Sequence, residues 1–144
     1  MMKVFLDTNI LMDWYQAERP GNALAKTILS AAGKDTYDIL LSTQSIVDGS
    51  YSLKKLGVSY QEFSGSLRHL RVVAHVIGID ELDMLWALEH DSGDFEDDMQ
   101  YACAYNNNCD YFITRDKELF KLNDPLCPMT VISLEKFVAA MREG

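Results

Sequence analysis

The sequence has few features of a disulfide-stabilised or membrane-bound protein. It holds only three cysteines in 144 residues, an odd number without CxxC spacing, which argues against a disulfide framework and a zinc site. No stretch approaches the roughly 20 apolar residues that a membrane span requires. The apolar run at residues 4–6 is too short for a signal peptide and leads directly into Asp7. We therefore expect a cytoplasmic protein with free thiols and no membrane association.

Basic residues are also scarce. The chain has 13 Lys and Arg against 22 Asp and Glu, which gives a net charge of -9 at pH 7. Proteins that bind nucleic acid through phosphate contacts normally carry a basic surface. A nucleic-acid substrate would therefore depend on bound metal and a local basic rim. Candidates for the rim are Lys54, Lys55, Arg115 and Lys117, with ordinary solvated side chains as the alternative.

Histidine is rare as well, since the chain has three, all outside its acidic segments. We expect His69, His75 and His90 to be surface or packing residues, so no histidine base is invoked. Cys103 stands between two alanines on a predicted helix, which indicates buried packing. Composition and length, with 48% apolar and 24% charged residues, are typical of a single globular domain over residues 1–144.

Short apolar segments alternate with helical patterns along the whole chain. This alternation predicts an α/β domain with a mostly parallel sheet. The predicted strands are residues 3–6, 38–41, 72–77, 111–114 and 130–132. The predicted helices are 10–16, a segment from Pro20 to a stop at Gly33, 43–56, 59–70, a segment beginning at Asp80, 95–105 and a closing helix capped by Ser133.

Acidic residues recur where a predicted strand ends or a predicted helix begins. Asp7 directly follows the first strand, and Asp116 follows the fourth. Asp48 lies on the helix after the second strand, and Asp97 lies in the first turn of the helix at 95–105. Residues beyond the carboxyl ends of strands share one crevice in an open parallel sheet. We therefore expect these distant acids to lie close together.

Such a cluster requires compensation of its charge. Two carboxylates roughly 5 Å apart repel by about 3 kcal/mol at an effective dielectric constant near 20. Without a cation, some of the acids would have to bind protons. Because the cluster offers only oxygen ligands, Mg²⁺ or Mn²⁺ is the expected ion.

Each acid also has a purely structural alternative. Asp and Asn often cap helices, which is an alternative for Asp7 and Asn9. Asp116 would then cap a turn at residues 117–120, and Asp48 would simply be exposed to solvent on its helix. These alternatives stay open from the sequence.

The acids at 94, 97 and 98 have the spacing i, i+3, i+4, which predicts one shared helix face. The helix dipole favours acids in a first turn, and this alone would explain one or two of the three. We expect Asp97 to face the crevice from the edge of the apolar stripe formed by Phe95 and Met99.

Three stretches of the chain resemble the PIN domain family. They are VFLDTNILMD at residues 4–13, DFEDDMQYACAYNNNCDYFITRDKELF at 94–120 and TVISLEKFVA at 130–139. The resemblance covers nearly the whole chain and implies a three-layer α/β/α sandwich with a central, mostly parallel sheet. It also implies a Mg²⁺- or Mn²⁺-dependent ribonuclease, as in the VapC-like toxins of bacterial toxin–antitoxin pairs.

The resemblance assigns roles to individual residues. It implies that Asp7, Asp97 and Asp116 bind the metal and that Asp48 assists catalysis. Asp48 stands where the family usually has Glu, so its side chain is one methylene shorter, and Gly49 follows it. The candidates for positioning the substrate are Asn9, Thr114 and Arg115.

Together these observations predict an endoribonuclease that uses one or two divalent ions to hydrolyse RNA phosphodiesters. The expected partners are RNA, an antitoxin protein and a second copy of the chain in a homodimer. One alternative is a non-catalytic PIN-like module that binds RNA or a protein partner, with Trp14, Tyr15 and Tyr51 as candidates for the protein interface. Another is a phosphatase or phosphotransfer receiver, for which Asp80 after the third strand is a weak match.

Overall fold

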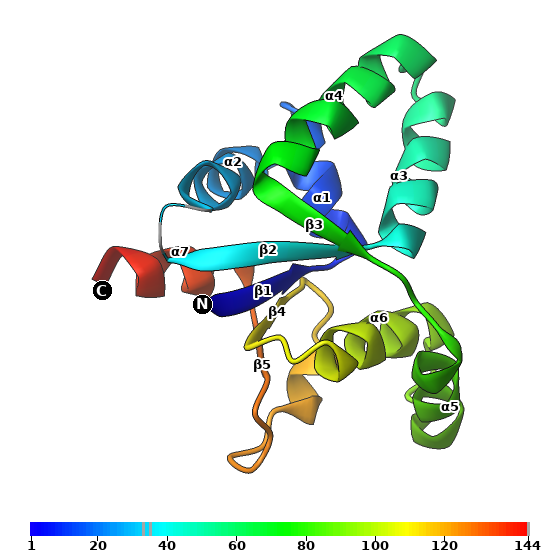
Figure 1. The fold of residues 1–144 in the computed structure, drawn as a ribbon, viewed down its shortest axis with the longest axis vertical. Coiled ribbons are helices and arrows are strands. Elements are labelled where there is room, and N and C mark those ends of the chain that lie inside the picture. The colour runs from blue at the N-terminus through cyan, green and yellow to red at the C-terminus, as the bar shows by residue number, and fades with distance from the viewer. Residues whose placement is uncertain (33, 35, 144) are drawn as a thin grey trace.

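A parallel sheet of five strands forms the centre of the computed structural model, which describes residues 1–32, 34 and 36–143 (Figure 1). The strand order is β3-β2-β1-β4-β5, and all four neighbouring pairs are parallel. In the central strand, Phe5 lies opposite Leu40 on one side and Phe112 on the other. The strands are β1 (Met2–Leu6), β2 (Tyr37–Ser42), β3 (Ala74–Ile77), β4 (Tyr111–Ile113) and β5 (Thr130–Ile132).

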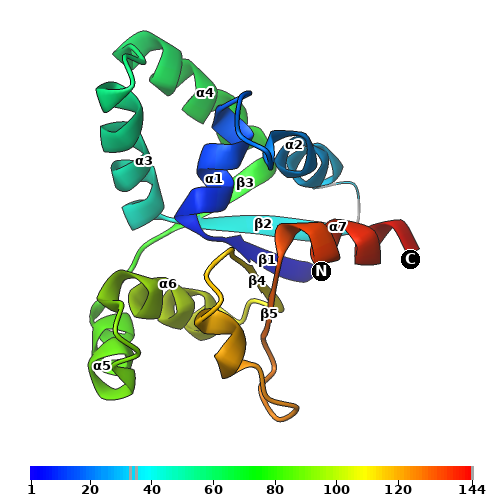
Figure 2. The same ribbon diagram turned by 180° about the vertical axis from the view of Figure 1, so that it is seen from behind.

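Helices cover both faces of this sheet and make a three-layer α/β/α sandwich (Figures 1 and 2). Three helices, α1 (Thr8–Tyr15), α2 (Asn22–Ala31) and α7 (Leu134–Glu143), pack on one face. Helix α6 and the short 3₁₀ helix η1 pack on the other, with α5 against α6. The remaining bounds are α3 (Thr43–Lys55), α4 (Tyr60–Val73), α5 (Glu81–His90), α6 (Phe95–Asn106) and η1 (Leu119–Leu122).

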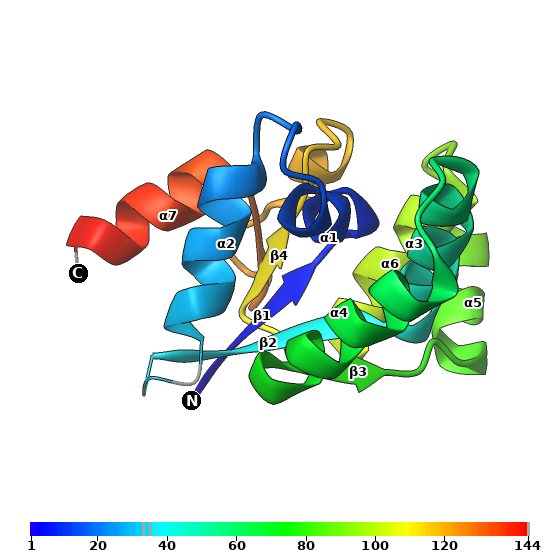
Figure 3. The same cartoon turned by 90° about the horizontal axis from the view of Figure 1, so that it is seen from above.

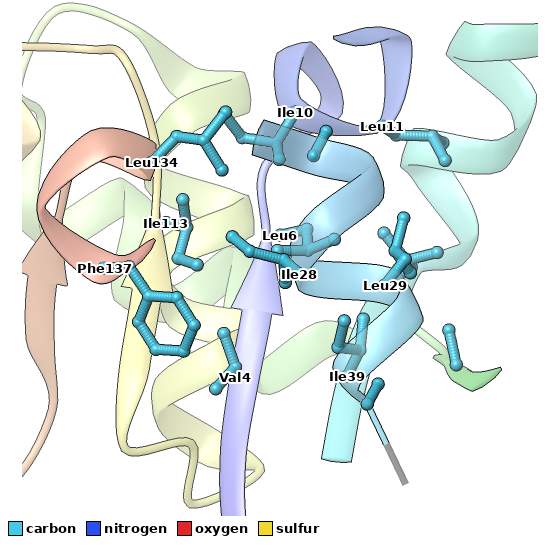
Figure 4. Packing of buried hydrophobic residues seen from close by; sticks show 14 of the residues in the cluster. Val4, Leu6, Ile10, Leu11, Ile28, Leu29, Ile39, Ile113, Leu134 and Phe137 are labelled. Carbon is cyan, nitrogen blue, oxygen red and sulfur yellow. The ribbon is translucent and has the colours of Figure 1, made fainter. Parts of the chain in front are cut away.

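The core is divided between the two faces because side chains alternate along each strand. In β1, Val4 and Leu6 face α2 and α7, while Phe5 faces α6. Figure 4 shows the first of these layers, in which Ile28 and Phe137 lie beside the two β1 side chains. Burial on both faces explains why residues 4–6 of β1 form a continuous apolar run rather than an alternating pattern.

The helices α3 and α4 extend away from the sheet in the view of Figure 1. Figure 3, seen from above, shows α3 on the side of the molecule away from α2 and α7. Ser42 caps α3, since its hydroxyl accepts a 3.0 Å hydrogen bond from the backbone N–H of Ser45. Gly57, at φ +85°, follows the end of α3 in a conformation that side chains disfavour. The start of β1 and the end of α7 lie on the side of the molecule away from α3 and α6 (Figures 1 and 2).

The structure confirms the predicted α/β architecture and shifts several of the predicted boundaries. Val72 and Val73 end helix α4, so the third strand begins at Ala74 rather than at position 72. Their β-branched side chains favour a strand only where the chain is packed into a sheet, and Val72 is 82% exposed on its helix. The second helix begins at Asn22 rather than at Pro20. Its predicted stop at Gly33 lies outside the described residues.

None of the helices in the described part of the chain combines the length and the apolar character that a membrane span requires.

Candidate active site

An open cleft of about 550 Å³ lies beyond the carboxyl ends of β1 and β4, with side chains from α3 and α6 in its lining. Figures 1 and 2 show these two helices on either side of the strand ends. Asp7, Asn9, Arg115 and Asp116 line it from the loops and helix that follow the strands. Its acidic lining residues are Asp7, Asp48, Asp94, Glu96, Asp97 and Asp116. The fold thus brings together the four acids that the sequence singled out.

Asp7 is the most deeply buried of these acids, with 5% of its surface exposed. One carboxylate oxygen accepts a 2.8 Å hydrogen bond from the backbone N–H of Thr8, and the other accepts a 2.8 Å bond from the Thr114 hydroxyl. Burial raises the pKa of Asp7, although both hydrogen bonds act to lower it. Asp7 therefore caps α1, which was the alternative role considered from the sequence, and it also lines the cleft.

Three consecutive residues after β4 contact three different elements. Thr114 is fully buried; it donates to Asp7 and accepts a 3.0 Å hydrogen bond from the backbone N–H of Asp116. Arg115 forms an ion pair with Asp13 of α1. Asp116 lies beside Asp97 of α6, and also accepts a hydrogen bond from the backbone of the following turn. The direction of each side chain is thus set by a different contact.

Asp97 and Asp116 form a carboxyl pair that shares a proton. Burial, the hydrogen bond to Asp116 and the neighbouring negative charges together raise the pKa of Asp97 to about 9, and burial is the largest of these causes. The pKa of Asp116 is lowered, because its carboxylate accepts that hydrogen bond. Like charges held this close cannot both remain ionised without a cation.

A second carboxyl pair joins α3 to α6. The pKa of Glu96 is raised to about 7 by its partial burial, by a hydrogen bond to Asp48 and by the neighbouring charges. Asp48 also accepts a 2.9 Å hydrogen bond from Gln44 one turn earlier. Sequence reasoning missed Glu96, although its place in the first turn of α6, beside Asp97, was a usable signal.

The acids at 94 and 98 have structural roles that the i, i+3, i+4 spacing did not predict. Asp94 caps α6, accepting a 3.1 Å hydrogen bond from the backbone N–H of Asp97, and also lines the cleft. Asp98 is 1% exposed and accepts hydrogen bonds from the backbone N–H and the hydroxyl of Ser92. The predicted single face of three acids is wrong, because Asp98 stabilises the connection between α5 and α6.

A buried polar network lies close to the cleft and was not found from the sequence. The Gln100 amide on α6 donates to the hydroxyls of Thr8 and Ser45, at 3.1 and 2.8 Å. These hydroxyls also contact each other at 2.7 Å. The network ties α1 and α3 to α6, and these are the helices that carry or follow Asp7, Asp48 and Asp97.

Of the four residues proposed for a basic rim, only Arg115 lines the cleft among the described residues. The three histidines are exposed, and Cys103 is fully buried, as predicted. Asp80 caps α5, with its carboxylate accepting from the backbone N–H of Asp83, and does not line the cleft. This position weighs against the phosphotransfer alternative.

The cleft fits a hard divalent cation, since its acidic side chains offer carboxylate oxygens and its lining includes no His or Cys among the described residues. The carboxyl groups are held by hydrogen bonds to each other and to threonine rather than around a common point. Accordingly, the described residues contain no ready-made group of three or more His, Cys, Asp or Glu side chains suited to a metal. An ion bound here would replace the shared protons as the neutralising charge.

Comparison with known families gives the identity of the fold. The PIN domain matches residues 3–118, which is most of the chain. The chain belongs to the PIN domain family. No curated protein sequence matches it. The family accounts for the α/β/α sandwich of this PIN domain.

Solved structures of PIN-like toxins resemble the whole fold. Mycobacterium tuberculosis VapC20, described as a sarcin–ricin loop cleaving toxin, is 15% identical to this chain and has a TM-score of 0.67. The similarity covers 83% of this chain and 95% of the VapC20 chain. A toxin–antitoxin complex from Klebsiella pneumoniae is 19% identical, with a TM-score of 0.65 and coverage of 91% and 97%. Rickettsia felis VapBC2, bound to promoter DNA, is 16% identical, with a TM-score of 0.61 and coverage of 92% and 98%. At these identities the likeness concerns the fold.

Proposed function

We propose that this PIN domain is a divalent-metal-dependent ribonuclease that hydrolyses RNA phosphodiester bonds and acts as the toxin of a toxin–antitoxin pair. The observation that carries the proposal is the cleft in which acids from the end of β1, from α3, from α6 and from the end of β4 meet. So many carboxyl groups in one cleft oppose the stability of the fold unless a cation neutralises them.

In this proposal Asp7, Asp97 and Asp116 hold Mg²⁺ or Mn²⁺. When bound, the ion stabilises the negative charge that develops on a phosphodiester during hydrolysis. Asp7 is oriented for this role by Thr8 and Thr114, which leave its carboxylate few rotational choices. Asp97 and Asp116 are already adjacent, so binding requires them to release one proton rather than to move together.

The pair of Asp48 and Glu96 supplies a proton acceptor on the α3 side of the cleft. A carboxyl group with a pKa of about 7 is suited to accept and return a proton near neutral pH. We assign this pair to the attacking water. Glu96 is one methylene longer than Asp48, and it supplies the reach that the shortened family acid lacks.

RNA is the proposed substrate because the cleft is open and carries groups suited to a single strand. Arg115 offers a cation, Asn9 an amide, and Tyr51 an aromatic ring that is 63% exposed. Exposed aromatic side chains provide stacking surfaces for unpaired bases. The description of Mycobacterium tuberculosis VapC20 as a toxin that cleaves the sarcin–ricin loop supports the same substrate class.

An antitoxin is the proposed protein partner. The Klebsiella and Rickettsia structures are toxin–antitoxin complexes, and this chain has an apolar groove of about 590 Å³ between α3 and α4. Its apolar lining residues include Ile46, Val47, Leu53, Val58 and Phe63. A homodimer is also proposed. The groove and the net charge of -9 favour a non-catalytic binding module as the second candidate function.

One experiment separates the enzyme from the binding module. The purified protein is incubated with an end-labelled, mixed-sequence RNA pool in Mn²⁺ or in EDTA, and the products are resolved on a gel. We expect fragments in Mn²⁺ and intact RNA in EDTA. The binding module would be identified instead by RNA that stays intact in Mn²⁺ while the fluorescence anisotropy of the labelled RNA rises as protein is added. An Asp7→Asn variant purified in parallel controls for contaminating ribonucleases.

A further inference from the structure

A fully buried acid lies close behind the cleft and is not one of its metal-site acids. Asp13, on α1, has no exposed surface. One carboxylate oxygen pairs with Nε of Arg19 at 2.8 Å, and the other pairs with Nη2 of Arg115. A buried carboxylate is tolerated only where opposite charge and hydrogen bonds compensate its lost hydration. Asp13 therefore depends on both arginines, and one of them reaches into the active site.

Arg115 occupies an unusual position in this acidic molecule. It is the only Lys or Arg among the described residues that line the cleft, and its side chain is 35% exposed. Within the described residues its guanidinium group contacts no acid other than Asp13. A guanidinium group has five N–H donors, so pairing one nitrogen with Asp13 leaves others for a ligand.

Gly21, just before α2, provides the space for this ion pair. A Cβ atom added at this position would meet both Nη2 of Arg115 and the carboxylate of Asp13. The backbone of Gly21 has φ -83° and ψ 0°, which alanine can also adopt. The need for glycine here is therefore one of space around the guanidinium and carboxylate groups.

We propose that Asp13 is a positioning residue, which holds the guanidinium of Arg115 at the edge of the cleft so that it receives a phosphate of the bound RNA. The inference rests on the proposed function, since it needs a phosphodiester substrate. Hydrogen bonds at Thr114 and Asp116 already hold the chain on either side of Arg115, so its long side chain is what remains to be positioned. Asp13 removes that freedom, and less entropy is lost when the phosphate binds.

The test is a double-mutant cycle with Asp13→Asn, Arg115→Gln and the double variant. Apparent KM and kcat are measured on the labelled RNA pool in Mn²⁺. We expect Arg115→Gln to raise KM roughly tenfold or more, as for loss of a hydrogen bond between charged groups. Asp13→Asn should raise KM by a similar factor with kcat changed less than about twofold. The double variant should be no worse than Arg115→Gln, because Asp13 acts through that arginine.

Gly21→Ala provides a perturbation that removes no charge, and it serves if Asp13→Asn fails to fold. We expect Gly21→Ala to raise KM when it is made in the wild-type protein. We expect it to leave KM unchanged when it is added to the Arg115→Gln variant. The matched control is Gly65→Ala on α4, where an added Cβ meets nothing within 4 Å. It should leave both constants at their wild-type values.

The outcomes are distinct. A KM that is unchanged by both Asp13→Asn and Gly21→Ala, or increases that simply multiply with that of Arg115→Gln, overturns the positioning role and leaves the proposed function standing. A wild-type protein that cuts no RNA in Mn²⁺ overturns the proposed function, and this inference with it.

Discussion

The hydroxyl of Thr114 donates a 2.8 Å hydrogen bond to the carboxylate of Asp7, although the two residues are 107 positions apart in the chain. Both side chains are buried, with Thr114 at 0% and Asp7 at 5% exposure. The bond joins the ends of the neighbouring strands β1 and β4 at the base of the cleft. It is one of the two contacts that compensate the burial of the Asp7 carboxylate.

Replacing Thr114 by valine should lower the free energy of unfolding by about 1–3 kcal/mol, because one buried oxygen of Asp7 loses its donor and the backbone N–H of Asp116 loses its acceptor. Valine matches threonine in shape, so packing is retained. Thr114→Ser is the matched control, since it keeps the hydroxyl and removes only a methyl group. Urea denaturation in EDTA at neutral pH measures both variants. A valine variant at least as stable as the serine variant would contradict this account of the bond.

Asp7→Asn should reduce RNA cleavage on the order of a hundredfold or more, because a negative ligand is lost from the proposed metal site. The fold should remain, since the Asn oxygen still accepts one of the hydrogen bonds and a buried charge is removed. The measurements are the rate of RNA cleavage and the melting temperature. The control is Asp38→Asn in β2, outside the cleft. Wild-type cleavage by Asp7→Asn would refute its assignment as a ligand.

The metal-free protein should lose stability as pH rises from about 5 to about 8. The pKa of Glu96 is raised from 4.5 to about 7 and that of Asp97 from 3.8 to about 9, so the folded state binds more protons than the unfolded state in this window. Stability is then highest at the acidic end and falls as these groups are forced to ionise. The lowered pKa of Asp116 has the opposite effect on stability, which is lost only as pH falls below the usual Asp pKa of 3.8.

Melting temperatures in EDTA across this pH range measure the effect. Millimolar Mn²⁺ should raise the melting temperature most at the alkaline end, because the ion binds the ionised carboxylates that repel each other there. Equal melting temperatures with and without Mn²⁺ at about pH 8 would count against a metal site in the cleft.

Glu96→Gln should weaken Mn²⁺ binding roughly tenfold, because the cleft loses one of the negative charges near the proposed metal ligands that attract the ion. In EDTA at alkaline pH the same variant should melt at a higher temperature than the wild type, because a repulsive charge is gone. Isothermal titration calorimetry and thermal melting report the two effects. Glu89→Gln, on the exposed surface of α5, is the control. Unaltered Mn²⁺ affinity would place Glu96 outside the ion's environment.

Much of the fold could be predicted because burial on both faces of a parallel sheet leaves a direct pattern in the sequence. The runs ending at Leu6, Leu41 and Ile113 are apolar without interruption, and each leads into polar residues where the strand leaves the core. Val72 and Val73 show the limit of this pattern. Their local preference for strand was overridden by the continuation of α4, whose buried residue is Leu70.

The candidate site was predictable in its membership but not in its pairing. Position relative to strand ends identified Asp7, Asp48, Asp97 and Asp116, which all line the cleft. Glu96 escaped notice because its role depends on Asp48, which lies 48 positions earlier and approaches it only through the packing of α3 near α6. Likewise, the position of Asp98 on α6, one residue after Asp97, predicted a side chain in the cleft. Its carboxylate instead accepts hydrogen bonds from Ser92 and is buried.

By itself, the sequence determined the alternation of strands and helices, the acids that follow strand ends and the family to which the chain belongs. These features depend on local burial and on neighbours along the chain. Only the tertiary structure decided which carboxyl groups share a proton, which acid is removed from the cleft, and that buried Asp13 holds Arg115 beside it. Electrostatic energy depends on distances of a few ångströms between side chains, and those distances exist only after the chain has folded.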